Sequence, residues 1–96
     1  MAKKTVPFNL EDISQLPNDK PVTYKVLDKD GNDLYTGSAK RGRVQDRLRE
    51  HLAEGPDLIR GGAKVQIEQQ ASIADAQAKE RRIIARSKPP LNKEGK

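Results

Sequence analysis

Residues 22–27, Val-Thr-Tyr-Lys-Val-Leu, and residues 34–36, Leu-Tyr-Thr, decide the fold of this chain. The first stretch is dense in β-branched and aromatic residues, which favour strands. The six residues between them, Asp-Lys-Asp-Gly-Asn-Asp at 28–33, have a composition typical of tight turns. The pattern therefore predicts a β-hairpin.

The sequence after the hairpin predicts two helices with a strand between them. The first helix should run from about Arg43 to Ala53, because Gly55-Pro56 follows it. Residues 63–69 alternate apolar and polar side chains, which indicates a third strand. The second helix should begin after Ser72 as N-cap and end near Ser87, before a pair of prolines.

These elements predict an α+β fold, a small three-stranded antiparallel sheet flanked by helices in the order ββαβα. A chain of 96 residues is large enough for one domain, which we place at residues 21–92. We expect residues 1–20 to form an N-terminal arm with at most one helical turn, between Leu10 and Leu16. Residues 93–96 are expected to form a flexible basic tail.

The composition excludes several classes of protein. The absence of cysteine excludes a disulfide scaffold, a thiolate nucleophile, a zinc finger and an iron–sulfur cluster. The single histidine, His51, leaves no room for a multi-histidine metal site. No stretch approaches the roughly 18 consecutive apolar residues of a membrane span, and the N-terminus lacks the apolar segment of a signal peptide. We therefore expect a cytoplasmic protein without a membrane partner.

The excess of positive charge is concentrated in two segments. The formal charge is +5, and residues 79–96, with seven basic and two acidic side chains, carry all of it. A second basic cluster consists of Lys40, Arg41, Arg43, Arg47 and Arg49. Such clusters indicate a polyanionic partner, most simply nucleic acid. Basic clusters can also be solvated surfaces that only keep the protein soluble. Charge alone leaves both interpretations open.

Charged and polar residues interrupt the apolar faces of both helices. At about 100° per residue, Glu80 falls near the centre of the inward face of the second helix. An unpaired carboxylate there is costly, so it should be neutral, paired with an arginine or bound to a cation. In the first helix, Arg47 and His51 border the apolar stripe.

Both helices must cover the sheet that carries Tyr24 and Tyr35, so these polar groups should converge. Arginine suits a phosphate, glutamate a divalent metal, and tyrosine or histidine a proton transfer. The tyrosines could equally be core aromatics, and Arg47 and Glu80 each other's partners.

Between Pro21 and Asn92 the chain resembles the GIY-YIG endonuclease family. Val22-Thr23-Tyr24 stands in place of Gly-Ile-Tyr, and Tyr35-Thr36-Gly37 in place of Tyr-Ile-Gly. Arg47, with His51 four residues later, matches the family's first helix, and Glu80 matches the metal-binding glutamate of its second helix. The segment from Pro89 to Asn92 matches the terminal Pro…Asn element. The chain departs from the pattern at Val22, where the family has glycine.

The resemblance implies a metal-dependent DNA endonuclease of low sequence specificity, acting in DNA repair or recombination. One divalent ion, Mg²⁺ or Mn²⁺, would bind Glu80, and Arg47 would bind the scissile phosphate. Tyr24 or Tyr35 would activate water with help from His51, and which tyrosine does so is left open. The expected substrate-binding residues, which would meet the DNA backbone, are Gly37, Lys40, Arg41, Arg43 and Asn92.

Two other functions remain possible on this scaffold. The Val22 departure is compatible with a catalytically inactive nucleic-acid-binding module. A basic face is also compatible with a module that binds an acidic protein. The oligomeric state is not encoded in any pattern that the sequence shows.

Overall fold

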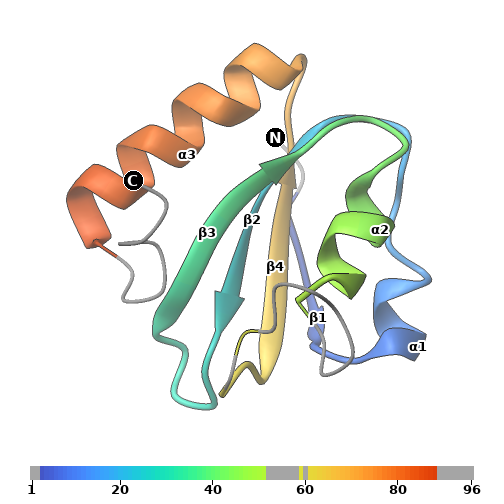
Figure 1. Ribbon diagram of the computed structural model, residues 1–96, viewed down its shortest axis with the longest axis vertical. Coiled ribbons are helices and arrows are strands. Elements are labelled where there is room, and N and C mark those ends of the chain that lie inside the picture. The colour runs from blue at the N-terminus through green and yellow to red at the C-terminus, as the bar shows by residue number, and fades with distance from the viewer. Residues whose placement is uncertain (1–2, 52–58, 60, 89–96) are drawn as a thin grey trace.

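A four-stranded antiparallel sheet forms the centre of the structure (Figure 1). The computed structural model describes residues 3–51, 59 and 61–88. The strands lie in the order β1-β4-β2-β3, so that β1 and β3 are the two edges. Their bounds are β1 Lys3–Pro7, β2 Val22–Leu27, β3 Asp33–Ala39 and β4 Lys64–Gln69.

The predicted hairpin is confirmed as β2 and β3. Asp28 begins its turn, and its carboxylate accepts hydrogen bonds from the backbone N–H groups of Asp30 and Asn32. The register places Tyr24 directly opposite Gly37. This pairing decides the geometry of the site described below.

The prediction of a three-stranded sheet is wrong, because β1 adds a fourth strand. Residues that we expected in an N-terminal arm pair with β4 from Lys3 opposite Glu68 to Pro7 opposite Lys64. The strand carries little sequence signal, since its only side chain that is not fully exposed is that of Val6. Lysine and proline are common on edge strands, where they discourage pairing with other chains.

In the residues that the structure describes, three helices accompany the sheet. The short α1 (Leu10–Ile13) lies within the range expected for a helical turn, and α2 (Val44–Arg49) lies within the first predicted helix. Residues 52 and 53, the predicted end of that helix, are outside the described residues. The second predicted helix is confirmed as α3 (Ile73–Ser87), in which the Ser72 hydroxyl accepts a hydrogen bond from the Asp75 N–H at 3.1 Å.

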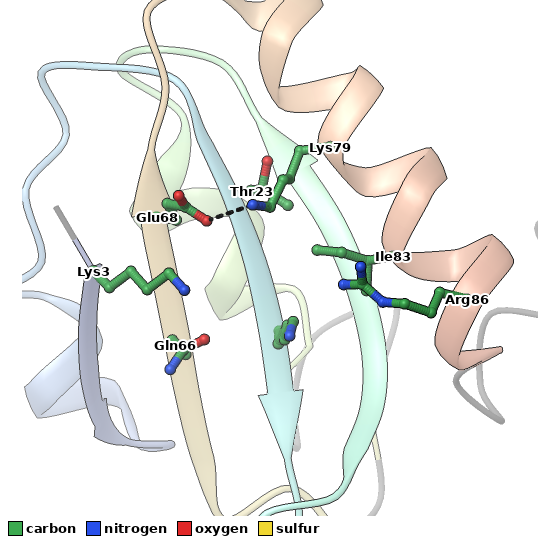
Figure 2. Close-up of a pocket in the computed structure, with 8 residues that line it drawn as sticks. Lys3, Thr23, Gln66, Glu68, Lys79, Ile83 and Arg86 are labelled. Carbon is green, nitrogen blue, oxygen red and sulfur yellow. Dashed lines mark ion pairs between the residues drawn. The ribbon is translucent and has the colours of Figure 1, made fainter. Parts of the chain in front are cut away.

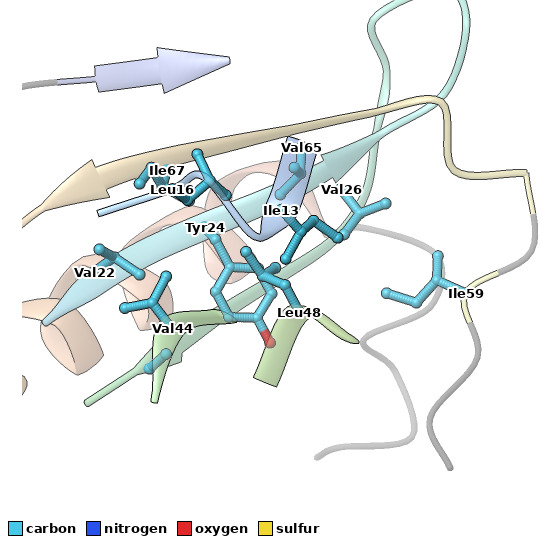
Figure 3. Packing of buried hydrophobic residues seen from close by; sticks show 11 residues of the cluster. Ile13, Leu16, Val22, Tyr24, Val26, Val44, Leu48, Ile59, Val65 and Ile67 are labelled. Carbon is cyan, nitrogen blue, oxygen red and sulfur yellow. The ribbon is translucent and has the colours of Figure 1, made fainter. Parts of the chain in front are cut away.

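The two faces of the sheet differ in character. One face carries the apolar side chains of β2 and β4, which pack against residues of α1, α2 and their connections (Figure 3). The other face is polar and lies under α3, where the Thr23 hydroxyl donates a hydrogen bond to the Ala76 carbonyl. The core residues labelled in Figure 3 are Ile13, Leu16, Val22, Tyr24, Val26, Val44, Leu48, Ile59, Val65 and Ile67.

Among the helices that the structure describes, none combines the length and the apolar character that a membrane crossing requires.

Candidate active site

A buried hydrogen bond joins the first predicted tyrosine to the single histidine. Tyr24 points from β2 toward α2, and its Oη lies 2.8 Å from Nε2 of His51, just beyond the end of that helix. Both side chains are only about 1% exposed. Two groups that can exchange a proton are therefore held together away from bulk water.

Tyr35 completes an aromatic cluster with these two residues. Its ring centroid lies 4.9 Å from that of His51 and 6.2 Å from that of Tyr24. Tyr35 and Gly37 are two residues apart on β3 and so face the same side of the sheet as Tyr24. Unlike Tyr24, Tyr35 is only half-buried, so it is the more accessible of the two tyrosines.

Gly37 allows the two tyrosines to lie against the β3 backbone. A β-carbon at this position would lie 2.6 Å from Tyr24 Oη and 3.1 Å from Tyr35 Cε2. Any side chain would therefore displace the Tyr24 hydroxyl from its present place. We expected Gly37 to bind substrate. In the structure, its lack of a side chain leaves the space that Tyr24 and Tyr35 occupy.

Burial and neighbouring charges keep the Tyr24 hydroxyl protonated. Burial is the largest cause that raises the pKa of Tyr24 above its usual value, and Tyr35 and Glu80 raise it further. The charge of Arg47 and its hydrogen bonding act in the opposite direction. Arg47 and Glu80 thus act electrostatically on the same hydroxyl, although they come from different helices.

Arg47 extends from α2 and forms an ion pair with Glu50, the residue that caps the C-terminal end of that helix. Glu50 also lies 3.8 Å from Arg43. Sequence reasoning missed Glu50 as a site neighbour, although its spacing of three residues from Arg47 is the usual one for such pairs on a helix.

Glu80 reaches the edge of the sheet from α3. It lies on the same side of the helix as the buried residues Ala76 and Ile83, as the helical spacing predicts. Its Oε1 accepts a hydrogen bond of 2.8 Å from the hydroxyl of Ser38. Ser38 was not among the predicted site residues, and its one signal was its position directly after Gly37.

The edge position of β3 explains how both faces of the sheet contribute to one site. Successive residues of a strand point to opposite faces, so Gly37 faces the tyrosines while Ser38 faces α3. Because β3 has a neighbour on one side only, groups from both faces can meet around its open edge. Sequence reasoning placed all these residues on one surface, whereas the structure brings them together from two.

The donor set around Glu80 fits a magnesium-like ion. In the part of the chain that the structure describes, no three His, Cys, Asp or Glu side chains gather as a closed metal site. Mg²⁺ keeps several water ligands and is commonly held by one or two carboxylates together with substrate phosphate. A single carboxylate, fixed by Ser38, satisfies that requirement.

A basic hollow borders Ser38, the hydrogen-bond partner of Glu80. Its volume is about 410 Å³, and it is lined by Ser38, Ala39, Lys40, Arg43 and Arg47. The structure thus groups two predicted substrate-binding residues, Lys40 and Arg43, with Arg47. It does not group Arg41 with them, because Arg41 lines a different hollow beside Lys20 and Gln70. Asn92 lies outside the described residues.

Val22, the departure from the GIY-YIG pattern, is a core residue. It begins β2, is fully buried, and pairs with Ala39 and Gln69 on the neighbouring strands. A β-branched residue suits this extended position. The substitution is two residues away from Tyr24 and leaves the Tyr24–His51 hydrogen bond in place.

Comparison with known proteins gives matches only at the level of structure. No family model matches the chain, and no curated protein matches it. The GIY-YIG N-terminal endonuclease domain of UvrC from Thermotoga maritima, bound to its catalytic magnesium, matches with a TM-score of 0.70 and 22% identity. The match covers 86% of this chain and 94% of that one.

Two point mutants of the same domain, each with a tyrosine replaced by phenylalanine and bound to its catalytic divalent cation, match similarly. Their TM-scores are 0.71 and 0.68, at 22% and 21% identity. Both matches cover 86% of this chain, and 94% and 93% of the respective mutant chains. The fold of this chain is therefore that of the GIY-YIG endonuclease domain, as the motifs around Tyr24 and Tyr35 predict.

Proposed function

We propose that this protein is a metal-dependent endonuclease that hydrolyses DNA phosphodiester bonds at a single divalent-ion site, with little sequence specificity. The observation that carries the proposal is the Tyr24 hydroxyl, which contacts His51 Nε2 at 2.8 Å and is influenced by both Arg47 and Glu80. A proton acceptor, a cation and a carboxylate around one hydroxyl suit hydrolysis of an anionic substrate better than they suit a structural core.

The basic hollow binds the scissile phosphate in this proposal. Arg47 provides a guanidinium whose hydrogen bonds strengthen as charge develops on the phosphate oxygens. Lys40 and Arg43, which line the same hollow, hold the adjacent backbone. Because Glu50 already pairs with Arg47, it orients the guanidinium before the substrate arrives.

Proton transfer passes through the Tyr24 hydroxyl to His51. Burial disfavours a free phenolate at Tyr24, as the direction of its pKa shift indicates. The hydroxyl can avoid that state by giving its proton to Nε2 of His51 while it accepts one from the attacking water. Tyr35, half-buried against the His51 ring, positions the imidazole.

Glu80 would hold the divalent ion, and Ser38 fixes the carboxylate through the hydrogen bond to Oε1. When bound, such an ion would neutralise charge on the phosphate oxygens and on the leaving group. Mg²⁺ and Mn²⁺ both suit a single carboxylate with water and phosphate ligands. The segment Leu16-Pro17 to Pro21 resembles the lead-in of the excision-repair nuclease subunit, which supports a role in DNA repair or recombination. The sequence features described above support a cytoplasmic location for that role.

Nicking of supercoiled plasmid DNA tests the proposal. We expect nicking with Mg²⁺ or Mn²⁺ and none with a chelator. Glu80→Gln and Arg47→Ala should each lower the rate about 100-fold or more, the magnitude usual for losing one charge-stabilising group. Asp75→Asn on α3 and Arg49→Ala on α2 remove the same charges from the same helices, and both should nick at nearly the original rate.

Two outcomes would overturn the proposal. Nicking that persists in the Glu80 and Arg47 variants would assign the activity to a different site or to a contaminant. DNA binding without cleavage under any divalent ion would instead identify the inactive nucleic-acid-binding module that the Val22 departure allows.

A further inference from the structure

A second, smaller basic hollow lies on the polar face of the sheet. It has a volume of about 80 Å³ and is bordered by residues of the strands β1, β2 and β4 and of the helix α3 (Figure 2). Its lining consists of Lys3, Thr23, Lys25, Gln66, Glu68, Lys79, Ile83 and Arg86. Four of these side chains are cationic and one is anionic.

The hollow and Glu80 lie on opposite flanks of α3. Lys79 and Arg86 are seven residues apart and share one stripe of the helix, about 60–80° to one side of the buried Ala76. Glu80 lies about 40° to the other side, where it meets Ser38. The helix thus separates the candidate active site from the small hollow.

The charge of the hollow is not neutralised from within. Glu68 pairs with Lys79, with Oε1 and Nζ 3.4 Å apart. Over the part of the chain that the structure covers, Lys3, Lys25 and Arg86 have no carboxylate partner. In Figure 2 the Lys3 ammonium and the Arg86 guanidinium both extend over the sheet from opposite sides of the hollow.

The size of the hollow suits one small oxyanion. A water molecule occupies about 30 Å³ in the liquid, so the space accommodates two or three waters or a single group such as a phosphate. Three cations from different elements around such a space form a site for one concentrated negative charge.

We propose that this hollow binds a backbone phosphate of duplex DNA, so that the duplex lies across α3 with phosphates on both flanks of the helix. A helix with its side chains is about 10–12 Å wide, and the major groove of B-DNA is about 12 Å wide. A duplex that receives α3 in its major groove would therefore place phosphates on both flanks of the helix. The identity of the polyanion rests on the proposed function, while the existence of the second phosphate contact is tested separately.

Equilibrium binding to a short labelled DNA duplex, measured with a chelator present at several salt concentrations, tests this site. Lys25→Glu/Arg86→Glu should weaken binding at least tenfold and reduce the steepness of the salt dependence by about one, since one lost phosphate contact contributes about 0.9. Lys20→Glu/Lys29→Glu, which changes the same charge on exposed connections at either end of β2, should have a clearly smaller effect. Lys25→Gln/Arg86→Gln gives a milder variant if the reversed charges impair folding.

The outcomes separate this inference from the nuclease proposal, because no cleavage occurs in the chelated assay. Equal weakening by the test and control pairs would show that only net charge matters and would overturn the second contact. Unchanged DNA binding by the test pair would do the same and would leave the face available to an acidic protein. If the test pair alone loses affinity while the unmodified protein never nicks plasmid, the contact stands and the nuclease proposal falls.

Discussion

Gly37 is the residue at which the two tyrosines and the β3 backbone approach most closely. An alanine there would place its β-carbon 2.6 Å from Tyr24 Oη and 2.7 Å from Cζ. We expect Gly37→Ala to lower the free energy of unfolding by about 1–3 kcal/mol, as overpacking usually does, and to lower plasmid nicking more than stability alone explains. Urea unfolding and nicking at a temperature where the variant is folded measure the two effects. A variant as stable and as active as the original protein would show that the Tyr24 ring does not lie against Gly37.

Tyr24 also sets an alkaline limit on stability. Its folded-state pKa is raised above the usual 10.0, mainly by burial. The unfolded state therefore releases this proton first as pH rises, and the stabilisation present below pH 10 is lost above it. Each pH unit above 10 should cost on the order of 1 kcal/mol. Thermal melting between pH 8 and 11 should show this decline, and Tyr24→Phe should flatten it; an equal decline in Tyr24→Phe would assign it to other groups.

At the scale of elements, strong local patterns were predictable and long-range pairings were not. The hairpin and α3 follow from turn residues, strand formers and an N-cap, which act within a few positions. The strand β1 was missed because its pairing with β4 is decided by contacts about sixty residues apart. Ser38 was missed for a related reason. Its hydrogen bond to Glu80 can be inferred only once β3 is known to be an edge strand.

The start of α3 determines where Glu80 meets β3. The Ser72 hydroxyl accepts the Asp75 N–H at 3.1 Å and so caps the first turn. Ser72→Ala should lower the free energy of unfolding by about 1 kcal/mol, measured by urea denaturation. Ser87→Ala, an equally exposed serine at the other end of the helix, should change it by a few tenths at most. Similar losses in both variants would show that the cap contributes nothing specific.

At the scale of the whole molecule, charge and size together determine how the protein would recognise DNA under the proposed function. The chain carries a net +5, and the structure groups cations in two hollows, one bordered by α3 and the other lined by Lys40, Arg43 and Arg47. Contacts to phosphate fix position but carry no sequence information. A domain this small, with its cations directed to the backbone, has little surface left for reading base edges.

We therefore expect DNA affinity to fall steeply with salt and cleavage to show little base preference. At about 0.9 per phosphate, three phosphates at the active-site hollow and one at the second hollow predict a slope of log affinity against log salt of about −3.6. A slope of about −2.7, again at about 0.9 per phosphate, would match the active-site hollow alone and would count against the second contact. Binding titrations at several salt concentrations measure the slope, and sequencing of cleavage products from a random DNA pool measures the preference. A sharp preference for one short sequence would show that α3 reads bases in the groove, which the phosphate contacts described above do not require.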